Sequence, residues 1–240
     1  MIIEGKNPVR EALAADKTFE KLMAEKSSDY ELNRIVTQAR AKGVKVVFCD
    51  KAALDRVSPT KKHQGLVAFT SEFRYSDVEE IKEYAEERGE PLFLLILDGV
   101  EDPHNLGSIL RVAECAGVHG VIIPKNRAVG VNDTVVRVSA GASEHVKVAR
   151  VVNINDVIRD LKKSGVWVYC ADMDGENIFD AKLTGNIALV VGGEGYGVKK
   201  LTKELCDGVI SLPLKGKINS LNASVAAGIV VYEVMRNRDV

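Results

Sequence analysis

The chain has 240 residues, 46% of them hydrophobic, and a formal net charge of −1 at pH 7. A chain of this length can bury one large core or two small ones. No apolar run approaches the roughly 18 residues that a membrane span needs, and the first residues lack the pattern of a signal peptide. These features predict a cytoplasmic protein with no membrane partner.

Neither the cysteines nor the histidines are spaced like metal ligands. Cys49, Cys115, Cys170 and Cys206 are far apart and form no C-x-x-C pair, and the four histidines show no H-E-x-x-H spacing. We therefore predict no metal site and no redox dithiol. The thiols are expected to be buried or half-buried in a reducing compartment.

The small net charge conceals an uneven distribution. Residues 1–75 contain 14 Lys and Arg against 10 Asp and Glu, a net charge of +4. Residues 76–90 carry a net charge of −5, and residues 91–240 a net charge of 0. The basic excess of the first segment is compatible with a nucleic-acid partner or with an ordinary solvated surface, and charge alone does not decide between them.

Residues 1–75 are predicted to form a small α/β domain. Pro8 suits the first turn of a helix that continues to about Ala15. Lys61-Lys62-His63-Gln64-Gly65 is expected to be a basic loop. Further helices are predicted over residues 32–42 and 51–57, and strands over residues 44–48 and 66–69.

An acidic helix is predicted to separate this domain from the rest. Residues 77–89 contain strong helix formers, follow Ser76 and end at Gly89, and their apolar positions recur at helical spacing. We expect a mostly exposed linker helix within residues 76–90, which makes residues 91–240 a second, larger domain.

The larger domain alternates between apolar strands and helices. Such alternation predicts an α/β fold with a parallel sheet covered by helices on both faces. Strands are expected over residues 92–97, 120–123, 166–170, 187–191 and 209–212, and helices over residues 107–116, 133–140, 154–164, 199–205 and 223–237.

Three polar or glycine-rich segments each follow a predicted buried strand. They are Asn105–Arg111, Gly192–Gly197 and Pro213–Ser224. In parallel sheets, sites are built from loops at strand ends, because the sheet is rigid and the loops are free to vary. The three segments are therefore expected to share one composite pocket.

The glycine segment lacks the common nucleotide-binding fingerprints. Val198 stands where the G-x-G-x-x-G pattern that starts at Gly193 requires glycine, and no G-x-x-x-x-G-K-[ST] sequence occurs. A nicotinamide enzyme and a P-loop NTPase are therefore disfavoured. The remaining alternatives are a tight structural turn and a turn whose backbone contacts the edge of a flat base, with the carboxylate of Glu194 inside it.

The other two segments contain helix caps and a cation. Asn105 is a candidate N-cap, and either Ser220 or Asn222 would cap the last helix. Arg111 stands in an otherwise apolar helix, about two turns from the preceding loop. Its guanidinium suits a phosphate, or alternatively an ion pair with Glu114.

Together the three segments resemble the signature motifs of the SpoU-type RNA ribose 2'-O-methyltransferases, which belong to the SPOUT superfamily. The segments 4–13 and 63–65 also resemble the RNA-binding domain of the branch that methylates a guanosine of large-subunit (23S) ribosomal RNA. The motif N-x-G-x-x-x-R appears as Asn105, Gly107 and Arg111, G-x-E-G-x-G as Gly192, Glu194, Gly195 and Gly197, and P…S-L-N-x-S-x-A as Pro213, Ser220, Leu221, Asn222, Ser224 and Ala226.

The resemblance implies a fold, a cofactor and partners. It implies a deep trefoil knot in the C-terminal third, S-adenosylmethionine as cofactor, RNA as substrate, and a homodimer in which the pocket lies against the partner subunit. The cofactor would be held by backbone contacts of Gly192, Leu212 and Leu221, with Gly193, Gly195 and Gly197 in the same cradle. Candidate RNA contacts are Lys61, Lys62 and His63 of the basic domain.

The implied reaction transfers a methyl group from a sulfonium to a ribose 2'-hydroxyl. Arg111 matches the family's catalytic arginine, and Asn105, Glu194, Ser220 and Asn222 would shape the site. Because the pKa of arginine exceeds about 12, we prefer a role in which Arg111 binds the target phosphate and stabilises the developing alkoxide. Two alternatives remain, namely the same chemistry on transfer RNA and a non-catalytic RNA-binding or ribosome-assembly protein.

Overall fold

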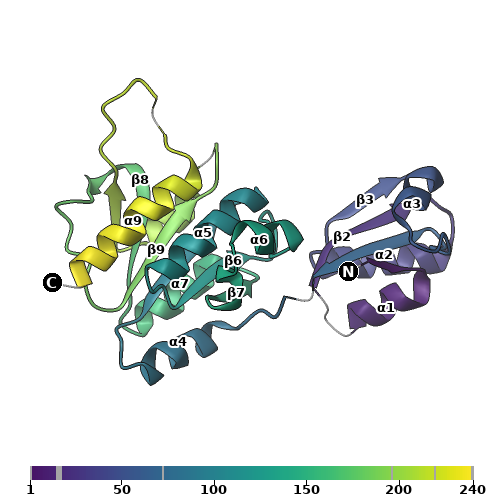
Figure 1. Ribbon diagram of the computed structural model, residues 1–240, viewed down its shortest axis with the longest axis horizontal. Helices are drawn as coiled ribbons and strands as arrows, with labels where there is room; N and C mark the ends of the chain where they lie inside the picture. Colours follow the sequence, from purple (N-terminus) through teal and green to yellow (C-terminus); the bar gives the residue numbers. More distant parts are fainter. Residues whose placement is uncertain (1, 15–17, 72, 196, 219, 239–240) are drawn as a thin grey trace. The chain divides into compact units, whose positions relative to one another are not determined.

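The computed structural model describes residues 2–14, 18–71, 73–195, 197–218 and 220–238 (Figure 1). The chain divides into two compact units, Met1–Arg74 and Tyr75–Val240. Within the described residues, every helix is too short or too polar to span a lipid bilayer.

The first unit is a four-stranded mixed sheet with the strand order β1-β4-β2-β3. β4 pairs antiparallel with both β1 and β2, and β3 pairs parallel with β2. Helices α1 and α2 share one apolar core with the sheet, and α3 contacts β2 and β4. The elements are β1 (Ile2–Glu4), α1 (Lys6–Ala14), β2 (Thr18–Glu25), α2 (Tyr30–Ala41), β3 (Val46–Cys49), α3 (Lys51–Val57) and β4 (Leu66–Ser71).

The sequence prediction omitted β1 and β2. β1 has only three residues. In β2 the register with β4 shifts between Phe19 and Lys21, so the buried positions Phe19, Leu22 and Ala24 do not alternate strictly. A bulge of this kind removes the two-residue period that identifies a half-buried strand.

The second unit confirms the predicted parallel sheet. Its six strands lie in the order β10-β8-β9-β5-β6-β7, and every neighbouring pair is parallel. The prediction omitted the edge strand β7, in which Lys147 and Arg150 interrupt the apolar pattern. The strands are β5 (Phe93–Asp98), β6 (Gly120–Pro124), β7 (Lys147–Val151), β8 (Trp167–Asn177), β9 (Ile187–Gly192) and β10 (Gly208–Ser211).

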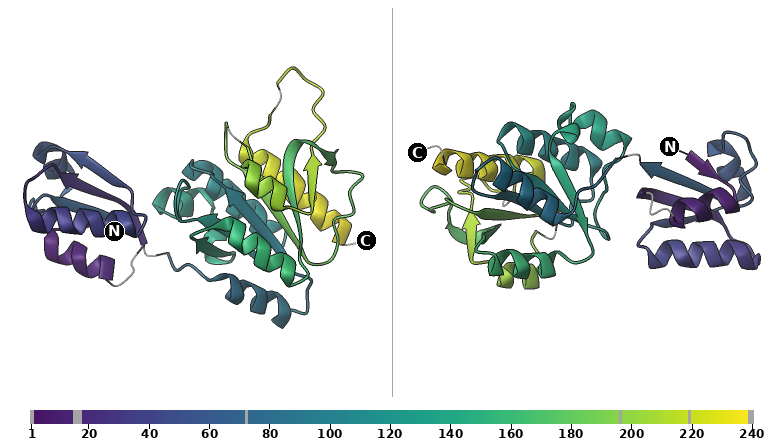
Figure 2. Two further views of the ribbon diagram at one scale, coloured as in Figure 1. Left: turned by 180° about the vertical axis from the view of Figure 1, so that it is seen from behind. Right: turned by 90° about the horizontal axis from the view of Figure 1, so that it is seen from below.

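Helices cover both faces of this sheet (Figure 2). Helices α4, α7 and α8 contribute to one core cluster with the strands, while α5 and α9 pack against each other on the other face. The helices are α4 (Val78–Glu87), α5 (Pro103–Cys115), α6 (Asp133–Val138), the 3-10 turn η1 (Ala142–Glu144), α7 (Ile154–Lys163), α8 (Lys200–Leu205) and α9 (Ala223–Arg238).

Helix α4 belongs to the core of the second unit, where we had expected a mostly exposed linker. Ile81 and Ala85 are buried in the shared cluster. Ile81 fits against Gly120 so closely that a Cβ at that glycine would lie 2.5 Å from its Cδ1. Asp77 begins the helix with a capping box completed by Glu80.

The order of the strands reverses between β5 and β9. From β5 the chain proceeds outward through β6 and β7, and it then crosses to form β8, β9 and β10 on the other side of β5. Asp98, the last residue of β5, is the register partner of Gly192, the last residue of β9. Parallel sheets open a crevice at such a switch point, so the loops that follow β5 and β9 are placed at a natural ligand site.

A buried histidine joins the start of β5 to the residues that follow α4. His119 is 2% exposed, and its Nδ1 accepts a hydrogen bond from the Phe93 N–H at 2.9 Å. The proton of the neutral ring therefore lies on Nε2, 3.0 Å from Glu90 Oε2. Burial lowers the pKa of His119, although Glu90 opposes this effect, and the hydrogen bond from Arg88 lowers the pKa of Glu90.

We predict that acidification weakens the second unit through this histidine. The unfolded chain binds a proton at His119 below about pH 6.5, whereas burial holds the pKa of the folded ring lower, so the free energy of unfolding falls as the pH drops through that value. The contribution of Glu90 is lost in a lower window, below about pH 4.3. Urea unfolding at pH 7.5 and 5.5 should show a smaller loss for His119→Gln than for wild type. The exposed His145→Gln variant serves as control, and an unchanged loss in His119→Gln would contradict the assignment.

Candidate functional site

A cavity of about 540 Å³ lies at the carboxyl ends of β8, β9 and β10. Its volume falls within the roughly 300–1,000 Å³ of small-molecule sites. Ten residues singled out in the sequence line it, namely Gly192, Gly193, Glu194, Gly195, Gly197, Leu212, Ser220, Leu221, Asn222 and Ala226. Two of the three motif segments therefore form one pocket.

The sequence prediction missed the wall contributed by β8. Ala171, Asp172 and Met173 line the cavity, and Lys203 Nζ lies 3.1 Å from the Asp172 carboxylate. The acidic residues 172 and 174, which directly follow the predicted strand 166–170, were the available signal. The strand itself is longer than predicted because β10 pairs with it as far as Asn177.

Three polar side chains, one from each motif segment, form a closed hydrogen-bonded triangle. Asn105 Nδ2 donates to Glu194 Oε1 at 2.8 Å. Asn222 Nδ2 donates to Asn105 Oδ1 at 3.0 Å and to Glu194 Oε1 at 2.9 Å. This triangle, referred to below as the polar triangle, brings the first motif to the edge of the pocket although Asn105 does not line the cavity.

The caps of α5 and α9 explain how the triangle is held. Asp102 is the N-cap of α5 and accepts from the His104 N–H at 2.9 Å, so the prediction that Asn105 caps the helix was wrong. Asn105 is the third residue of the helix, and its side chain remains available to Glu194. At α9, Asn222 Oδ1 accepts from the Ser224 N–H at 2.9 Å, which leaves its Nδ2 for the triangle.

The glycine segment after β9 folds back on itself. The Gly197 N–H donates to Gly193 O at 3.3 Å, and the two residues form an antiparallel bridge. A Cβ on Gly192 would lie 2.1 Å from the backbone carbon of Gly197, and a Cβ on Gly193 would lie 2.0 Å from Gly99 O. Gly195 and Gly197 have φ angles of +87° and +62°, which glycine adopts at no steric cost.

Arg111 lies on the exposed surface of α5 and does not line the cavity. The ion pair with Glu114 that we had considered does not form, and Arg111 makes no hydrogen bond or ion pair with any residue that the structure describes. Cys115, expected to be at least half-buried, is also exposed on α5. The guanidinium is thus free to bind an external anion.

The basic loop of the first unit has a defined conformation. Lys61 and Gln64 adopt φ angles of 58° and 49°, which are uncommon for residues other than glycine. His63 is 3% exposed, its Nδ1 accepts from the Gly65 N–H at 3.0 Å, and its Nε2 lies 3.1 Å from Asp55. His63 therefore holds the loop from beneath, and its ring has almost no surface for the direct RNA contact that we had expected.

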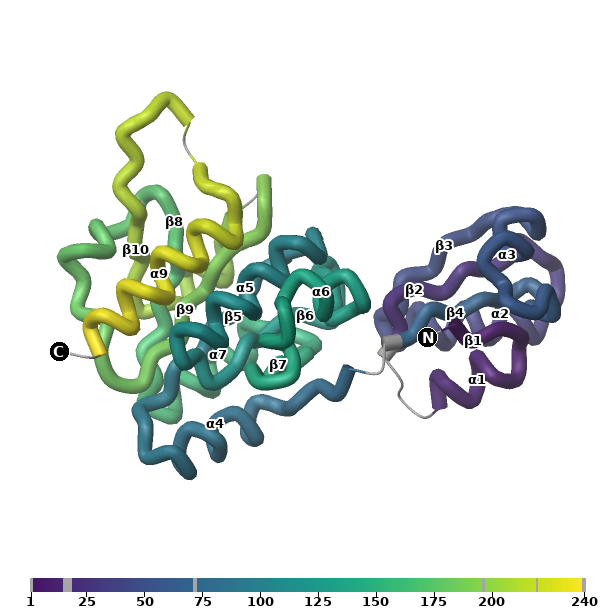
Figure 3. The backbone as a smooth tube through the Cα atoms, viewed as in Figure 1, coloured from purple at the N-terminus to yellow at the C-terminus, as the bar shows by residue number. Residues whose placement is uncertain are grey.

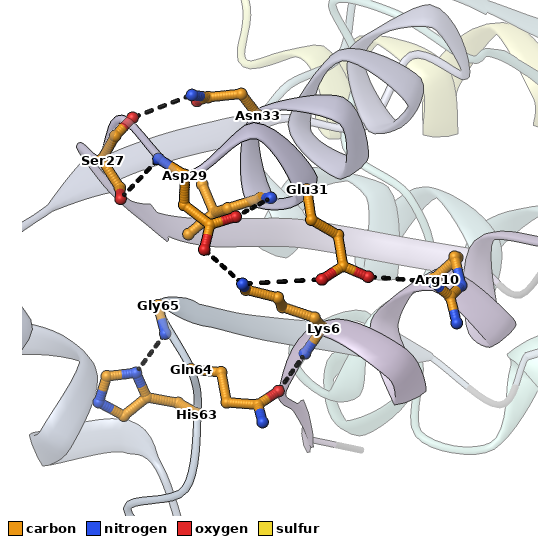
Figure 4. Close-up of polar contacts among 10 residues, drawn as sticks. Lys6, Arg10, Ser27, Asp29, Glu31, Asn33, His63, Gln64 and Gly65 are labelled. Carbon is orange, nitrogen blue, oxygen red and sulfur yellow. Dashed lines mark hydrogen bonds and ion pairs between the residues drawn. The ribbon is translucent and has the colours of Figure 1, made fainter.

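The cations near this loop differ in their partners. Figure 4 shows Lys6 directed at Asp29 and Glu31, with Nζ distances of 2.5 and 3.7 Å, and Arg10 paired with Glu31 at 3.1 Å. Lys61 and Lys62 are exposed, and their ammonium groups have no hydrogen bond or ion pair with the residues that the structure covers. They are therefore available to an anionic partner.

Comparison with known families matches both units. A family model described as "SpoU rRNA Methylase family" matches residues 92–232. A second model, described as "RNA 2'-O ribose methyltransferase substrate binding", matches residues 2–76.

Individual relatives match along nearly the whole chain. YacO of Bacillus subtilis, whose name places it in the TrmH family of tRNA/rRNA methyltransferases, is 44% identical over 98% of this chain and 95% of its own length. RlmB of Coxiella burnetii, named as a 23S rRNA (guanosine-2'-O-)-methyltransferase, is 44% identical over 94% of this chain and 91% of its own length.

The fold also has solved counterparts. The crystal structure of the SpoU methyltransferase AviRb from Streptomyces viridochromogenes, in complex with the cofactor AdoMet, has a TM-score of 0.62 and 24% identity. The match covers 98% of this chain and 89% of AviRb. At this identity the likeness concerns the fold.

We predict that two glycines of the β9 loop tolerate no side chain. Gly192→Ala and Gly193→Ala would drive a Cβ into backbone atoms, and each should lower the free energy of unfolding by about 1–3 kcal/mol. Gly216→Ala is the matched control, since a Cβ there meets no atom within 4 Å, and it should change stability by less than about 0.5 kcal/mol. Urea unfolding measures all three, and equal stabilities would show that the loop is less tightly packed than described.

Proposed function

The chain belongs to the SpoU rRNA methylase family, and we propose from this premise that it methylates a guanosine of 23S ribosomal RNA. As a family member it is an enzyme that transfers a methyl group from S-adenosylmethionine to a ribose 2'-hydroxyl of RNA. The proposal of a 23S guanosine rests on relatives such as RlmB, which match both units of the chain. The name of YacO, at equal identity, supports transfer RNA as the second candidate.

The cavity suits S-adenosylmethionine in size and chemistry. Its volume of about 540 Å³ is ample for a ligand of this size. Leu214 and Leu221, 39% and 40% exposed, offer apolar surface to a flat base. Glu194 gives the lining a carboxylate that favours a cation. Gly192, Leu212 and Leu221 would hold the cofactor through their backbone, with Gly193, Gly195 and Gly197 beside them.

When bound, the cofactor supplies a methyl group made electrophilic by its sulfonium. In our proposal the remaining catalysis is positioning of the ribose hydroxyl and stabilisation of the charge that it develops. Arg111 would bind the phosphate beside the target ribose and lower the energy of the alkoxide, since arginine remains protonated and is a poor base.

The polar triangle would orient the reacting edge of the pocket. Glu194 accepts from Asn105 and Asn222 through a single oxygen, Oε1, so its second oxygen remains for a ligand. Ser220 lines the same cavity. We infer that Glu194 and Ser220 contact the substrate, and that Asn105 and Asn222 fix the carboxylate.

RNA recognition would fall to residues 1–74, with residues 75–240, helix α4 included, as the methyltransferase domain. The two unpaired lysines, Lys61 and Lys62, project from a loop whose backbone is held by buried contacts of His63. A rigid loop with free ammonium groups suits the phosphates of a structured RNA, because little conformational entropy is lost on binding.

A homodimer is the assembly that we propose. Val225, Ile229 and Tyr232 form an exposed apolar stripe along α9, with exposed fractions of 50%, 38% and 46%, at the spacing of one helix face. A second copy would cover this stripe and bring Arg111 of one subunit toward the pocket of the other. Sedimentation of the protein should then give twice the mass of the chain, and a monomer would contradict the proposal.

We also propose that the C-terminal segment threads into a trefoil knot. The enzyme would work in the cytoplasm, where ribosomal RNA is assembled into ribosomes. Support for the knot comes from the contact between the loops that follow β9 and β10 through Glu194 and Asn222. Figure 3 shows the backbone that connects β10 to α9, apart from residue 219.

We predict that the labelled product is a 2'-O-methylguanosine of 23S RNA. Incubation with radiolabelled S-adenosylmethionine and total RNA from cells that lack the enzyme, followed by mapping of the labelled ribose, identifies the nucleotide. Label in a transfer RNA would favour the second candidate, and label on a base would refute ribose methylation.

Replacement of Arg111 by Ala should lower kcat by about 10²–10³-fold or more, since it removes the group that stabilises developing charge. The dissociation constant for S-adenosylmethionine, measured by calorimetry, should stay near the wild-type value because Arg111 does not line the cavity. Arg159→Ala on α7 is the control for loss of an exposed arginine. Turnover equal to that of wild type would rule out the role of Arg111.

The double variant Lys61→Ala/Lys62→Ala should raise KM for RNA about tenfold or more and reduce the salt dependence of binding by up to about two counterions. Its affinity for S-adenosylmethionine should not change. Arg159→Ala/Lys163→Ala removes two exposed cations from the other unit and serves as control. Equal RNA affinities in the two double variants would place the RNA contacts elsewhere.

A further inference from the structure

A buried carboxylate lies beneath the glycine loop and outside the three motifs. Asp98 ends β5, and its side chain has no exposed surface. Its backbone oxygen accepts from the Gly193 N–H at 3.0 Å, at the point where the glycine loop leaves β9. An ionised carboxylate in such a place needs a counter-charge or several hydrogen bonds to remain charged.

Lys199 supplies both. Its backbone N–H donates to Asp98 Oδ2 at 3.0 Å, and its ammonium group contacts Oδ1 of the same carboxylate. Lys199 directly precedes α8, so it marks the end of the loop that begins at Gly193. The loop is therefore tied at its first and last residues to a single residue of β5.

Described residues between these two ties make further contacts or line the cavity. Gly193 lies against Gly99, which follows Asp98 with a φ of +85°. Glu194, next in the chain, takes part in the polar triangle, and Gly195 and Gly197 line the cavity. A displacement of Lys199 would thus move the residues that face the cofactor.

We propose that Asp98 and Lys199 form a clasp that sets the shape of the cofactor loop, which makes them positioning residues for S-adenosylmethionine binding. The inference rests on the proposed placement of the cofactor in this cavity. Lys199 is 53% exposed, so the competing role is a direct contact with an RNA phosphate. The clasp is favoured because the backbone and the side chain of Lys199 converge on the same carboxylate.

The clasp predicts how single and double substitutions of Asp98 and Lys199 change the affinity for S-adenosylmethionine. Lys199→Met leaves the buried Asp98 charge with one backbone donor from Lys199, and it should raise the dissociation constant for S-adenosylmethionine about tenfold. Asp98→Asn keeps an acceptor for the Lys199 N–H without a charge and should have a smaller effect. The double variant Asp98→Asn/Lys199→Met should therefore bind more tightly than Lys199→Met alone, because no charge is stranded.

Calorimetry on the full-length protein measures these affinities without RNA. Lys199→Arg should rescue binding, and Lys200→Met is the control, since Lys200 is 92% exposed beside the clasp. If Lys199→Met does not fold, the double variant and Asp98→Asn still carry the test: both must bind the cofactor measurably more weakly than wild type, but by less than about tenfold, and wild-type affinity in both would overturn the clasp.

Two results would overturn the clasp. One is wild-type cofactor affinity in Lys199→Met with a raised KM for RNA, which would assign Lys199 to the RNA. The other is a double variant no better than Lys199→Met. A wild-type protein that binds the cofactor but methylates a different RNA would refute the proposed target and leave the clasp intact. Absence of cofactor binding in wild type would instead refute the cavity as the cofactor site.

Discussion

The pairing of β5 with β9 is the constraint on which the site depends. These strands are far apart in the sequence, and their register places Asp98 beside Gly192. Because both strands are parallel and buried, their carboxyl ends meet at one edge, and the loops that follow cannot separate. Asn105 of the first motif therefore contacts Glu194 of the second. Asn222 of the third motif, next to α9, joins them at the same edge through the polar triangle.

Several residues have an ordinary structural explanation when each is considered alone. Their contacts at the site give them a chemical role as well. Asn222 is a helix cap, yet the same amide also holds Glu194. Lys6 and Arg10 of the first unit are paired with carboxylates, whereas the surface cations Arg111, Lys61 and Lys62 have no acidic partner among the described residues. A site for a cationic cofactor and a polyanionic RNA needs both kinds of group. The fixed carboxylate of Glu194 attracts the cofactor, and the exposed cations attract the RNA.

The sequence predicted the second unit well because its strands are continuous apolar runs and its helices have clear caps. The sequence predicted strands less well where their limits depend on pairing with a neighbouring strand. β2 contains a register shift, β7 is an interrupted edge strand, and the end of β8 owes its length to β10. Ten pocket residues were singled out from the sequence, whereas Asp172 and Met173 were not, because no local pattern indicates which strand will lie beside β9.

The residues that line the cavity span Ala171 to Ala226 and include none from β5, β6 or β7. During synthesis from the N-terminus, the first unit and half of the second sheet can emerge before any wall of the pocket exists. Because α9 completes the wall of the cavity, the cofactor can stabilise the chain only once this last helix has begun to form. Loss of cofactor would act on the final stage of folding and leave the earlier strands unaffected.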